Sequence, residues 1–291
     1  MTGLPLLVPE LPEVEVLVRH LGPLLQGKII RAVQVRRSRL LGHTSVRQLS
    51  HVLRESKFLQ VSRRGKFLLF ALSREAAPKN VLLLGHLGMT GRMYLLSARA
   101  PLPKHTAIVL ALGAEKFVFE DTRYFGRFTL DLRPLERLGP EPLSDEFTAD
   151  TLARALKNSK QAIKTKLLDQ SLVAGVGNIY ASEALFRAGI SPRLPARKLR
   201  QAQVRRLWQA IRQVLTEAIE CGSTVTLSHS DPENRDSFFY FGRTPGSENS
   251  YEERLLVYDR WREPCLVCGK SIRRIVQAAR STFYCPQCQK G

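Results

Sequence analysis

The spacing of hydrophobic residues along the chain changes character once. Residues 11–25 carry leucines and valines three or four positions apart, the spacing that gives an α-helix one apolar face. Pro12 is compatible with this helix because the first turn tolerates a proline. Short runs rich in apolar and β-branched residues follow, which predicts an antiparallel β-sandwich or barrel. The runs are residues 29–35, 58–61, 67–72, 81–84, 108–112, 117–119 and 128–132.

Beyond these runs the hydrophobic pattern becomes helical. A proline-rich stretch, residues 133–142, has the composition of a linker. Residues 201–220 then carry an apolar stripe from Leu207 to Ile219, which predicts a long amphipathic helix. The polar segment 229–250 contains proline and glycine and is expected to be a mobile loop. The helices expected in this half of the chain are residues 151–156, 163–168, 181–188 and 201–220.

Four of the five cysteines lie near the end of the chain as two Cys-x-x-Cys pairs, Cys265 with Cys268 and Cys285 with Cys288. Each pair places two thiolates on one tight turn, and two such turns supply the four ligands of a tetrahedral structural Zn²⁺. The alternative is two disulfides or free thiols, but a chain of this length needs no disulfides and carries no export signal. We therefore expect one structural zinc ion. Cys221, which ends the long helix, is assigned no function.

The charge balance indicates the partner. The chain has 45 lysines and arginines against 26 acidic residues, a formal charge of +19, so it should attract phosphates, and nucleic acid is the expected ligand. An anionic membrane surface is the alternative, but no helix combines a lysine face with a large apolar one. No apolar run approaches the roughly 18 residues that span a bilayer, and residues 1–8 do not resemble a signal peptide. We expect a cytoplasmic, nucleoid-associated monomer.

Two glycines, Gly175 and Gly177, precede Asn178 between two expected helices. Glycines at such a point let the backbone turn tightly and present N–H groups, at a helix N-terminus, to a phosphate. A plain turn between helices is the alternative interpretation. Lys164 and Lys166 on the preceding helix, together with the positive charge of the chain, favour phosphate binding.

Several stretches then carry a resemblance: PELPEVE at residues 9–15, HLGMTG at 86–91, DTRYFG at 121–126, GVGNIYASE at 175–183, and the four-cysteine segment. Together they resemble the formamidopyrimidine-DNA glycosylase branch of the formamidopyrimidine-DNA glycosylase and endonuclease VIII family, over nearly the whole chain. Leu11 favours that branch, because the endonuclease VIII branch more often has glycine there. The resemblance implies a DNA-bending repair enzyme that removes oxidised purines such as 8-oxoguanine and formamidopyrimidine and then cuts the strand.

The family also implies the fold class, α+β, with an N-terminal helix and antiparallel β-sandwich, a helix-two-turn-helix domain and a C-terminal zinc finger. The domains expected from this resemblance are a catalytic β-sandwich at residues 9–133, a linker at 134–146, the helical DNA-binding domain at 147–228, a flexible lesion-side loop at 229–258 and the zinc finger at 259–291.

A base inside a duplex must be flipped out before its glycosidic bond can be reached, and the enzyme fills the space that the base leaves. The resemblance implies that Met89, Arg123 and Phe125 fill it, with Arg123 facing the orphaned cytosine. Taken one at a time, these would be a core methionine, a surface arginine and a core phenylalanine. The family often has a lysine where Ser159 falls, so we shift that strand contact to Lys160. The expected phosphate and strand contacts are His105, Arg123, Lys160, Lys164 and Asn178.

Pro9 matches the family's N-terminal nucleophile, a secondary amine that attacks C1′ of the sugar and yields an iminium electron sink. As written, however, Pro9 is internal, and an amide nitrogen cannot attack C1′. Either translation starts at Val8, which the bacterial start codon GTG can encode, or residues 1–8 are an extension that is cleaved later or retained. We favour a start at Val8 with removal of the initiator residue.

The remaining catalytic roles follow from the resemblance. Glu10 matches the acid that protonates the opened sugar or the departing base, assisted by Glu13, although a carboxylate at a helix N-terminus is also favoured by the helix dipole. Lys66 matches the lysine of proton transfer in β-elimination, or it is a further basic residue contacting phosphate. Arg280, on the finger, matches the arginine linked to δ-elimination.

The sequence therefore predicts a base-excision-repair glycosylase and abasic-site (β,δ) lyase. It would act on double-stranded DNA containing oxidised bases, through a Schiff base on an N-terminal proline. Two alternatives remain open. An endonuclease VIII-like glycosylase for oxidised pyrimidines is one, because residues 229–250 are too divergent to fix the damaged base. A non-catalytic damaged-DNA-binding protein is the other, if residues 1–8 are retained.

Overall fold

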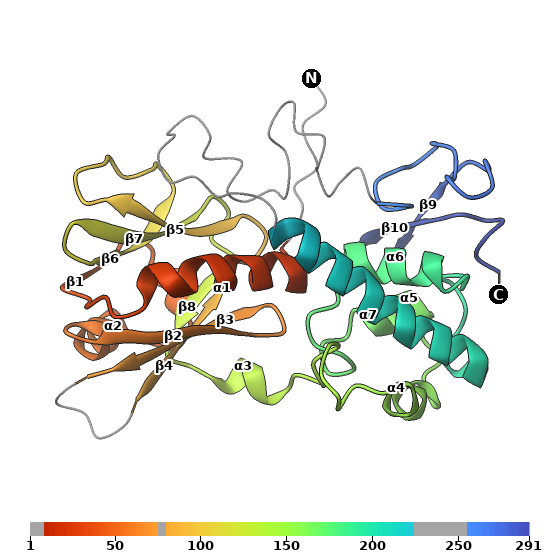
Figure 1. The fold of residues 1–291 in the computed structure, drawn as a ribbon, viewed down its shortest axis with the longest axis horizontal. Helices are drawn as coiled ribbons and strands as arrows, with labels where there is room; N and C mark the ends of the chain where they lie inside the picture. Colours follow the sequence, from red (N-terminus) through yellow and green to blue (C-terminus); the bar gives the residue numbers. More distant parts are fainter. Residues whose placement is uncertain (1–8, 75–79, 224–254, 291) are drawn as a thin grey trace. The chain divides into compact units, whose positions relative to one another are not determined.

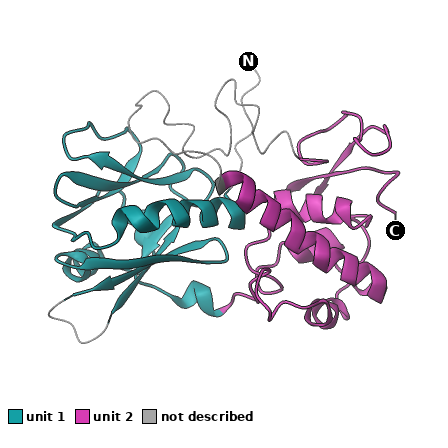
Figure 2. Cartoon of the chain, viewed as in Figure 1, with its two compact units in different colours: residues 1–136, 226–243 teal, residues 137–225, 244–291 magenta. Residues whose placement is uncertain are grey.

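The computed structural model describes residues 9–74, 80–223 and 255–290, which form two compact units (Figure 2). The first unit contains the described residues up to Glu136 and the second starts at Arg137, inside the stretch expected to be a linker. Most of the expected lesion-side loop lies outside the described residues. None of the helices in the described part of the chain has the length and apolar character that crossing a membrane requires.

The first unit is a sandwich of two four-stranded sheets, with strand orders β1-β6-β7-β5 and β2-β3-β4-β8 (Figure 1). Every pairing within them is antiparallel, which confirms the expected fold class. Three short helical segments, η1 (Ser38–Leu41), α2 (Val46–Leu53) and α3 (Arg133–Glu136), connect or follow the strands. The strands are β1 (Ala32–Val35), β2 (Lys57–Arg64), β3 (Phe67–Ser73), β4 (Val81–His86), β5 (Gly91–Ser97), β6 (Thr106–Ala111), β7 (Glu115–Asp121) and β8 (Arg127–Thr129).

The helix α1 (Leu11–Leu25) packs on β2 and β3 and closes the core of the sandwich. Its apolar stripe is buried as the sequence predicts, because these side chains recur on one face of the helix. Phenylalanines fill the space between the sheets, and the rings of Phe70 and Phe128 both contact that of Phe117, each with centroids 5.9 Å apart. This rigid core carries the connecting turns in which most of the expected site residues of the first unit lie.

The second unit combines helices with the C-terminal finger. The long helix α7 (Gln201–Ser223) packs against α4 (Ala149–Leu156) and α6 (Asn178–Arg187). Two short segments, α5 (Ile163–Leu167) and η2 (Ala196–Lys198), complete the helical part. The finger hairpin, β9 (Arg273–Gln277) and β10 (Arg280–Tyr284), packs on α6, and both belong to one compact unit.

A buried carboxylate fixes the chain where it enters the finger. Glu183 on α6 is 2% exposed and accepts hydrogen bonds from the backbone N–H groups of Leu256, Val257 and Tyr258 at 2.8 to 2.9 Å. Burial raises the pKa of Glu183, against the lowering effect of these three donors. The finger therefore starts from a defined position on α6.

Candidate active site and nucleic-acid interface

The N-terminus of α1 holds the first pair of expected catalytic residues. Pro9 is half-buried and Glu10, the N-cap residue, is only 1% exposed. The backbone N–H of Glu10 donates to Oε2 of Glu13 at 2.9 Å, one half of a capping box. Glu13 therefore orients the backbone beside Pro9. A carboxyl group as buried as that of Glu10, next to a proline, is suited to proton transfer in a partly dry site.

The turn that carries Lys66 is tied to the same helix. Gly65 and Lys66 connect β2 to β3, and Gly65 adopts a φ of +57°, which favours glycine. The guanidinium of Arg63 donates to the Gly65 carbonyl at 3.0 Å and to the Glu15 carboxylate on α1 at 2.9 Å. Burial works against ionisation of Glu15, but hydrogen bonds from Arg63 and Arg19 leave its pKa lowered. The ion pair thus fixes the Lys66 turn relative to α1.

His86, at the end of β4, was not among the expected site residues. Its Nδ1 accepts a hydrogen bond from the Gly88 N–H at 3.0 Å, and its ring lies 4.7 Å from that of Phe67, centroid to centroid. Burial, then the positive charges of Lys66 and Arg127, lower the pKa of His86 to about 4. The imidazole is therefore neutral at pH 7 and supports the turn that leads to Met89. Its place in the HLGMTG stretch was the only signal in the sequence.

The three expected space-filling residues lie on two neighbouring turns of the first unit. Met89 is half-buried between β4 and β5, and Arg123 and Phe125 are exposed between β7 and β8. The turns touch, because a Cβ on Gly88 would lie 2.7 Å from the Phe125 carbonyl carbon. Phe125 is 43% exposed, with the guanidinium carbons of Arg123 and Arg39 at 4.8 and 5.8 Å from its ring centroid. An exposed aromatic ring flanked by two cations suits stacking on bases beside phosphates.

His105 lies next to this pair of turns. Its side chain is half-buried, and its carbonyl accepts a hydrogen bond from the Asp121 N–H at 3.1 Å. Asp121 in turn pairs across the sheet with Gly91, two residues after Met89. The backbone around His105 is thereby connected to the turn expected to enter the DNA.

Lys164, expected to contact phosphate, occupies a different environment. Its side chain has no exposed surface, and the ammonium group donates to the Asn178 side-chain oxygen, to the Ser281 carbonyl at 3.0 Å and to the Thr282 hydroxyl at 2.8 Å. A buried cation is stable only with such partners. Because the ammonium is inaccessible, we correct the expected phosphate contact: Lys164 joins α5, the start of α6 and the finger.

The turn at residues 175–177, before α6, is held by hydrogen bonds to the side chain of Gln170. The side chain of Gln170 accepts from the Gly175 N–H and donates to the Val176 carbonyl, both at 2.9 Å. Gly175 has a φ of +88°, which requires glycine, and Gly177 is the N-cap of α6. The first residue of the helix, Asn178, is half-buried, whereas Lys160 is exposed. Residues 175–177 are buried, so the turn holds the N-terminus of α6 in a defined position.

The four cysteine sulfurs of the finger form one cluster. All lie within 4.8 Å of one another, with Sγ–Sγ distances of 3.9 Å for Cys265 and Cys288 and 3.4 Å for Cys268 and Cys285. Four thiolates about 2.3 Å from a central Zn²⁺ are about 3.8 Å apart in a tetrahedron, so the geometry fits the ion. The finger binds one structural zinc, as the sequence predicts.

Arg280 starts the second strand of the finger hairpin and is exposed. The hairpin turn preceding it is formed by Ala278 and Ala279, both with left-handed φ angles, of 47° and 58°. Two left-handed residues match the twist of an antiparallel hairpin, although alanine is a strained choice there. The turn projects Arg280 from the finger while the zinc cluster and Lys164 hold its base.

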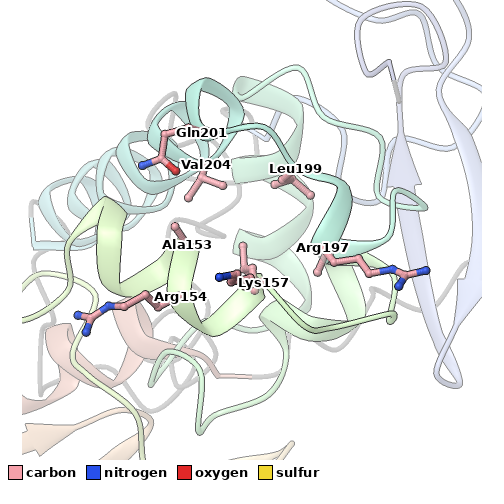
Figure 3. Close-up of a pocket in the computed structure, with 9 residues that line it drawn as sticks. Ala153, Arg154, Lys157, Arg197, Leu199, Gln201 and Val204 are labelled. Carbon is pink, nitrogen blue, oxygen red and sulfur yellow. The ribbon is translucent and has the colours of Figure 1, made fainter.

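The second unit also has a pocket of about 250 Å³ (Figure 3). None of the residues that line it carries a carboxylate, thiol, hydroxyl or imidazole group, so the pocket lacks an acid–base pair. Arg154 and Arg197 flank it on opposite sides. The lining residues are Ala153, Arg154, Leu156, Lys157, Ala196, Arg197, Leu199, Gln201 and Val204.

Comparison with known proteins matches both units. Residues 8–128 match the formamidopyrimidine-DNA glycosylase N-terminal domain, residues 138–230 the formamidopyrimidine-DNA glycosylase H2TH domain, and residues 262–291 the zinc finger found in FPG and IleRS. The formamidopyrimidine-DNA glycosylase of Thermus thermophilus is 42% identical, covering 97% of this chain and 98% of its own. That of Desulfitobacterium hafniense is 39% identical, covering 97% and 100%.

Solved structures agree over the same length. The Lactococcus lactis formamidopyrimidine-DNA glycosylase bound to DNA containing an abasic site is similar with a TM-score of 0.82 and 29% identity. A complex with DNA containing carbocyclic 8-oxoguanine gives 0.84 and 30%. In both cases the alignment covers 97% of this chain and 100% of the other.

Proposed function

The chain belongs to the formamidopyrimidine-DNA glycosylase family and is a DNA glycosylase of base excision repair, and on that premise we propose its substrate and chemistry. It excises 8-oxoguanine and formamidopyrimidines from double-stranded DNA and then cleaves the strand as an abasic-site lyase. The observation that carries this proposal is the buried N-terminus of α1, where Pro9 precedes Glu10. The match to the family's N-terminal domain begins one residue earlier, at Val8.

The nucleophile in this proposal is the amine of Pro9, freed when the chain starts at Val8 and the initiator residue is removed. The amine attacks C1′ while the bond from C1′ to the damaged base breaks, and the sugar ring then opens at its ring oxygen. The departing base and the ring oxygen each take up a proton, one of which comes from the Pro9 amine and the other from Glu10. The product is an iminium between Pro9 and the opened sugar. The electron-poor iminium acidifies the C2′ protons, which prepares the strand for elimination.

Strand cleavage follows from that iminium. Loss of a C2′ proton, to which Lys66 contributes, expels the 3′ phosphate by β-elimination. A second elimination expels the 5′ phosphate, and Arg280 stabilises the leaving phosphate by charge. Hydrolysis of the remaining iminium frees Pro9.

Duplex distortion is assigned to the two turns of the sandwich. Met89, Arg123 and Phe125 enter the space left by the flipped base, with Arg123 donating to the unpaired cytosine. The Phe125 ring supports this assignment because it is exposed and flanked by cations. His105, Lys160 and Asn178 hold the phosphates, in a monomer that acts in the cytoplasm on the nucleoid.

Borohydride trapping tests the nucleophile directly. Two forms are compared on a duplex with 8-oxoguanine opposite cytosine: the chain that begins at Pro9 and the chain that retains residues 1–8. The first should be reduced to a covalent complex whose crosslinked peptide starts at Pro9, and the second should bind without trapping. Pro9→Gly in the shorter form should weaken trapping.

The same assay separates the alternatives. Trapping on duplexes with oxidised pyrimidines, but not with 8-oxoguanine, would favour the endonuclease VIII-like preference. Equal trapping of both forms would refute Pro9 as the nucleophile. The mass of the N-terminus of the protein made from its own gene shows which form exists, and a retained extension would favour a damage-binding protein.

A further inference from the structure

The two turns proposed to enter the DNA meet at one buried carboxylate. Asp121 ends β7 and has no exposed surface. Its Oδ1 accepts hydrogen bonds from the Thr90 hydroxyl at 2.6 Å and the Arg123 N–H at 3.1 Å, and its Oδ2 accepts from the Gly126 N–H at 2.8 Å. One side chain therefore fixes both ends of the segment 123–126 and the residue next to Met89.

Thr90 completes the junction between the turns. Its hydroxyl donates to Asp121 and also accepts from the Arg123 N–H at 3.2 Å, and its side chain is nearly buried, at 8% exposure. The N–H of the next residue, Gly91, donates to the Leu87 carbonyl at 2.8 Å and closes the turn around Met89. The two turns are thus linked directly through side-chain oxygens.

Backbone contacts tighten the same junction. Gly88 has a φ of +65°, and a Cβ there would lie 2.7 Å from the Gly126 nitrogen. A Cβ on Gly126 would lie 2.5 Å from the Phe119 ring. Tyr124, between Arg123 and Phe125, has a left-handed φ of 55°, which residues with a side chain disfavour. The backbone at Tyr124 is therefore in a conformation that its side chain disfavours, and the hydrogen bonds from the Arg123 and Gly126 N–H groups to Asp121 offset this cost.

We propose that Asp121 and Thr90 are positioning residues that assemble Met89, Arg123 and Phe125 into one rigid wedge before DNA is bound. The inference rests on the proposed function, which assigns these three side chains to the duplex. Insertion between stacked bases is opposed by the loss of stacking, and a wedge that is already ordered loses little further freedom on entry. A single buried side chain that accepts hydrogen bonds from both turns suits this task.

Thr90 permits a test that removes one hydroxyl and keeps the shape of the side chain. Thr90→Val loses both hydrogen bonds described above, and Thr90→Ser keeps the hydroxyl. Thr44→Val is the matched control in the same unit. Thr44 is 7% exposed, and its hydroxyl similarly bonds one side chain, Thr129 at 2.8 Å, and accepts one backbone N–H, that of Leu130 at 3.0 Å.

Three readouts are measured on the chain that begins at Pro9. The first is excision of 8-oxoguanine opposite cytosine, and the second is the fluorescence rise of a 2-aminopurine beside the lesion, which reports unstacking. The third is borohydride trapping on a single-stranded abasic oligonucleotide, in which no stack has to be opened. Thr90→Val should slow excision and the fluorescence rise about tenfold relative to Thr44→Val. This is the size expected for the net loss of one buried hydrogen bond, because the Arg123 N–H keeps its bond to Asp121.

Trapping on the single strand and the Tm should be equal in Thr90→Val and Thr44→Val, and Thr90→Ser should restore excision. Asp121→Asn should slow excision more than Thr90→Val does, because the asparagine amide turns an N–H donor toward a backbone N–H. The inference is overturned if Thr90→Val excises as fast as Thr44→Val, or if it loses single-strand trapping to the same degree as excision. If the unaltered chain neither excises nor traps, the proposed function fails instead.

Discussion

Acidification should destabilise the β-sandwich through His86. The imidazole accepts the Gly88 N–H at Nδ1 and lies near the charges of Lys66 and Arg127, and its pKa falls to about 4 from an ordinary value of 6.5. Between these values the unfolded chain binds a proton that the folded chain does not. The free energy of unfolding therefore falls as the pH drops from 6.5 to about 4, and stays level with respect to this group outside that window.

The size of the effect follows from the pKa difference. At about 1.4 kcal/mol per unit, the full window corresponds to at most about 3.5 kcal/mol, and because His86 is only half-buried we lower this to about 2 kcal/mol. Carboxyl groups titrate in the same pH range, so a variant is needed that removes only the contribution of His86. His86→Asn keeps an acceptor for the Gly88 N–H and does not titrate near these pH values.

The assay must report on the first unit alone, because the two units can unfold separately. Both tryptophans, Trp208 and Trp261, lie in the second unit, so their fluorescence is unsuitable. Urea unfolding is instead measured at pH 7 and at pH 4.5. A short hydrogen-exchange pulse, always given at the same pH, labels the unfolded fraction, which is read on peptides from β3 and β4. The unaltered chain should lose about 2 kcal/mol more than His86→Asn. Equal losses in both proteins would refute the assignment of the proton to His86.

Three further perturbations address the finger. Cys268→Ser should abolish zinc binding, measured by metal analysis, and weaken duplex binding at fixed salt at least tenfold. Unchanged affinity for the duplex would show that the finger does not contribute to DNA binding. Lys164→Met should lower the unfolding free energy of the second unit by about 3 kcal/mol, because three oxygens around the buried ammonium lose their donor, whereas Lys160→Met should change it by less than about 0.5 kcal/mol. Ala278→Asn with Ala279→Gly should raise the Tm of the second unit, a gain of about 1–2 kcal/mol from relief of two left-handed alanines; a lower Tm would contradict the strain.

Local patterns in the sequence predicted the elements that depend on local physics. The spacing of apolar residues was sufficient to predict α1 and α7, and the spacing of the cysteines was sufficient to predict the zinc site. Each of these patterns lies within one helix face or one turn. The strand β5 was not expected, although its alternation is clear once seen: Met93 and Leu95 face the core while Arg92 and Tyr94 are half-buried. The glycine at the start of this strand and the polar residues between its apolar ones obscure the alternation in the sequence.

The contacts that organise the site depend on residues far apart in the chain. In a chain of +19, a lysine is expected to face solvent, and the convergence of Asn178, Ser281 and Thr282 on Lys164 makes its burial possible. Thr90 and Asp121 are likewise 31 positions apart, and nothing in the spacing of either motif indicates their hydrogen bond. The roles of Pro9 and Glu10 came from resemblance, since a proline followed by a glutamate is otherwise an ordinary helix start.

The burial of Lys164 limits how freely the finger can be exchanged. Related fingers occur in proteins of other kinds, and any of them could supply four cysteines and a metal ion. A transplanted finger would also have to carry a hydroxyl where Thr282 stands and hold the backbone carbonyl of residue 281 in the same place, or the buried ammonium would lose both of the acceptors that the finger supplies. The success of a chimera would therefore depend on one hydroxyl side chain at position 282 and on the backbone path of β10 beside it.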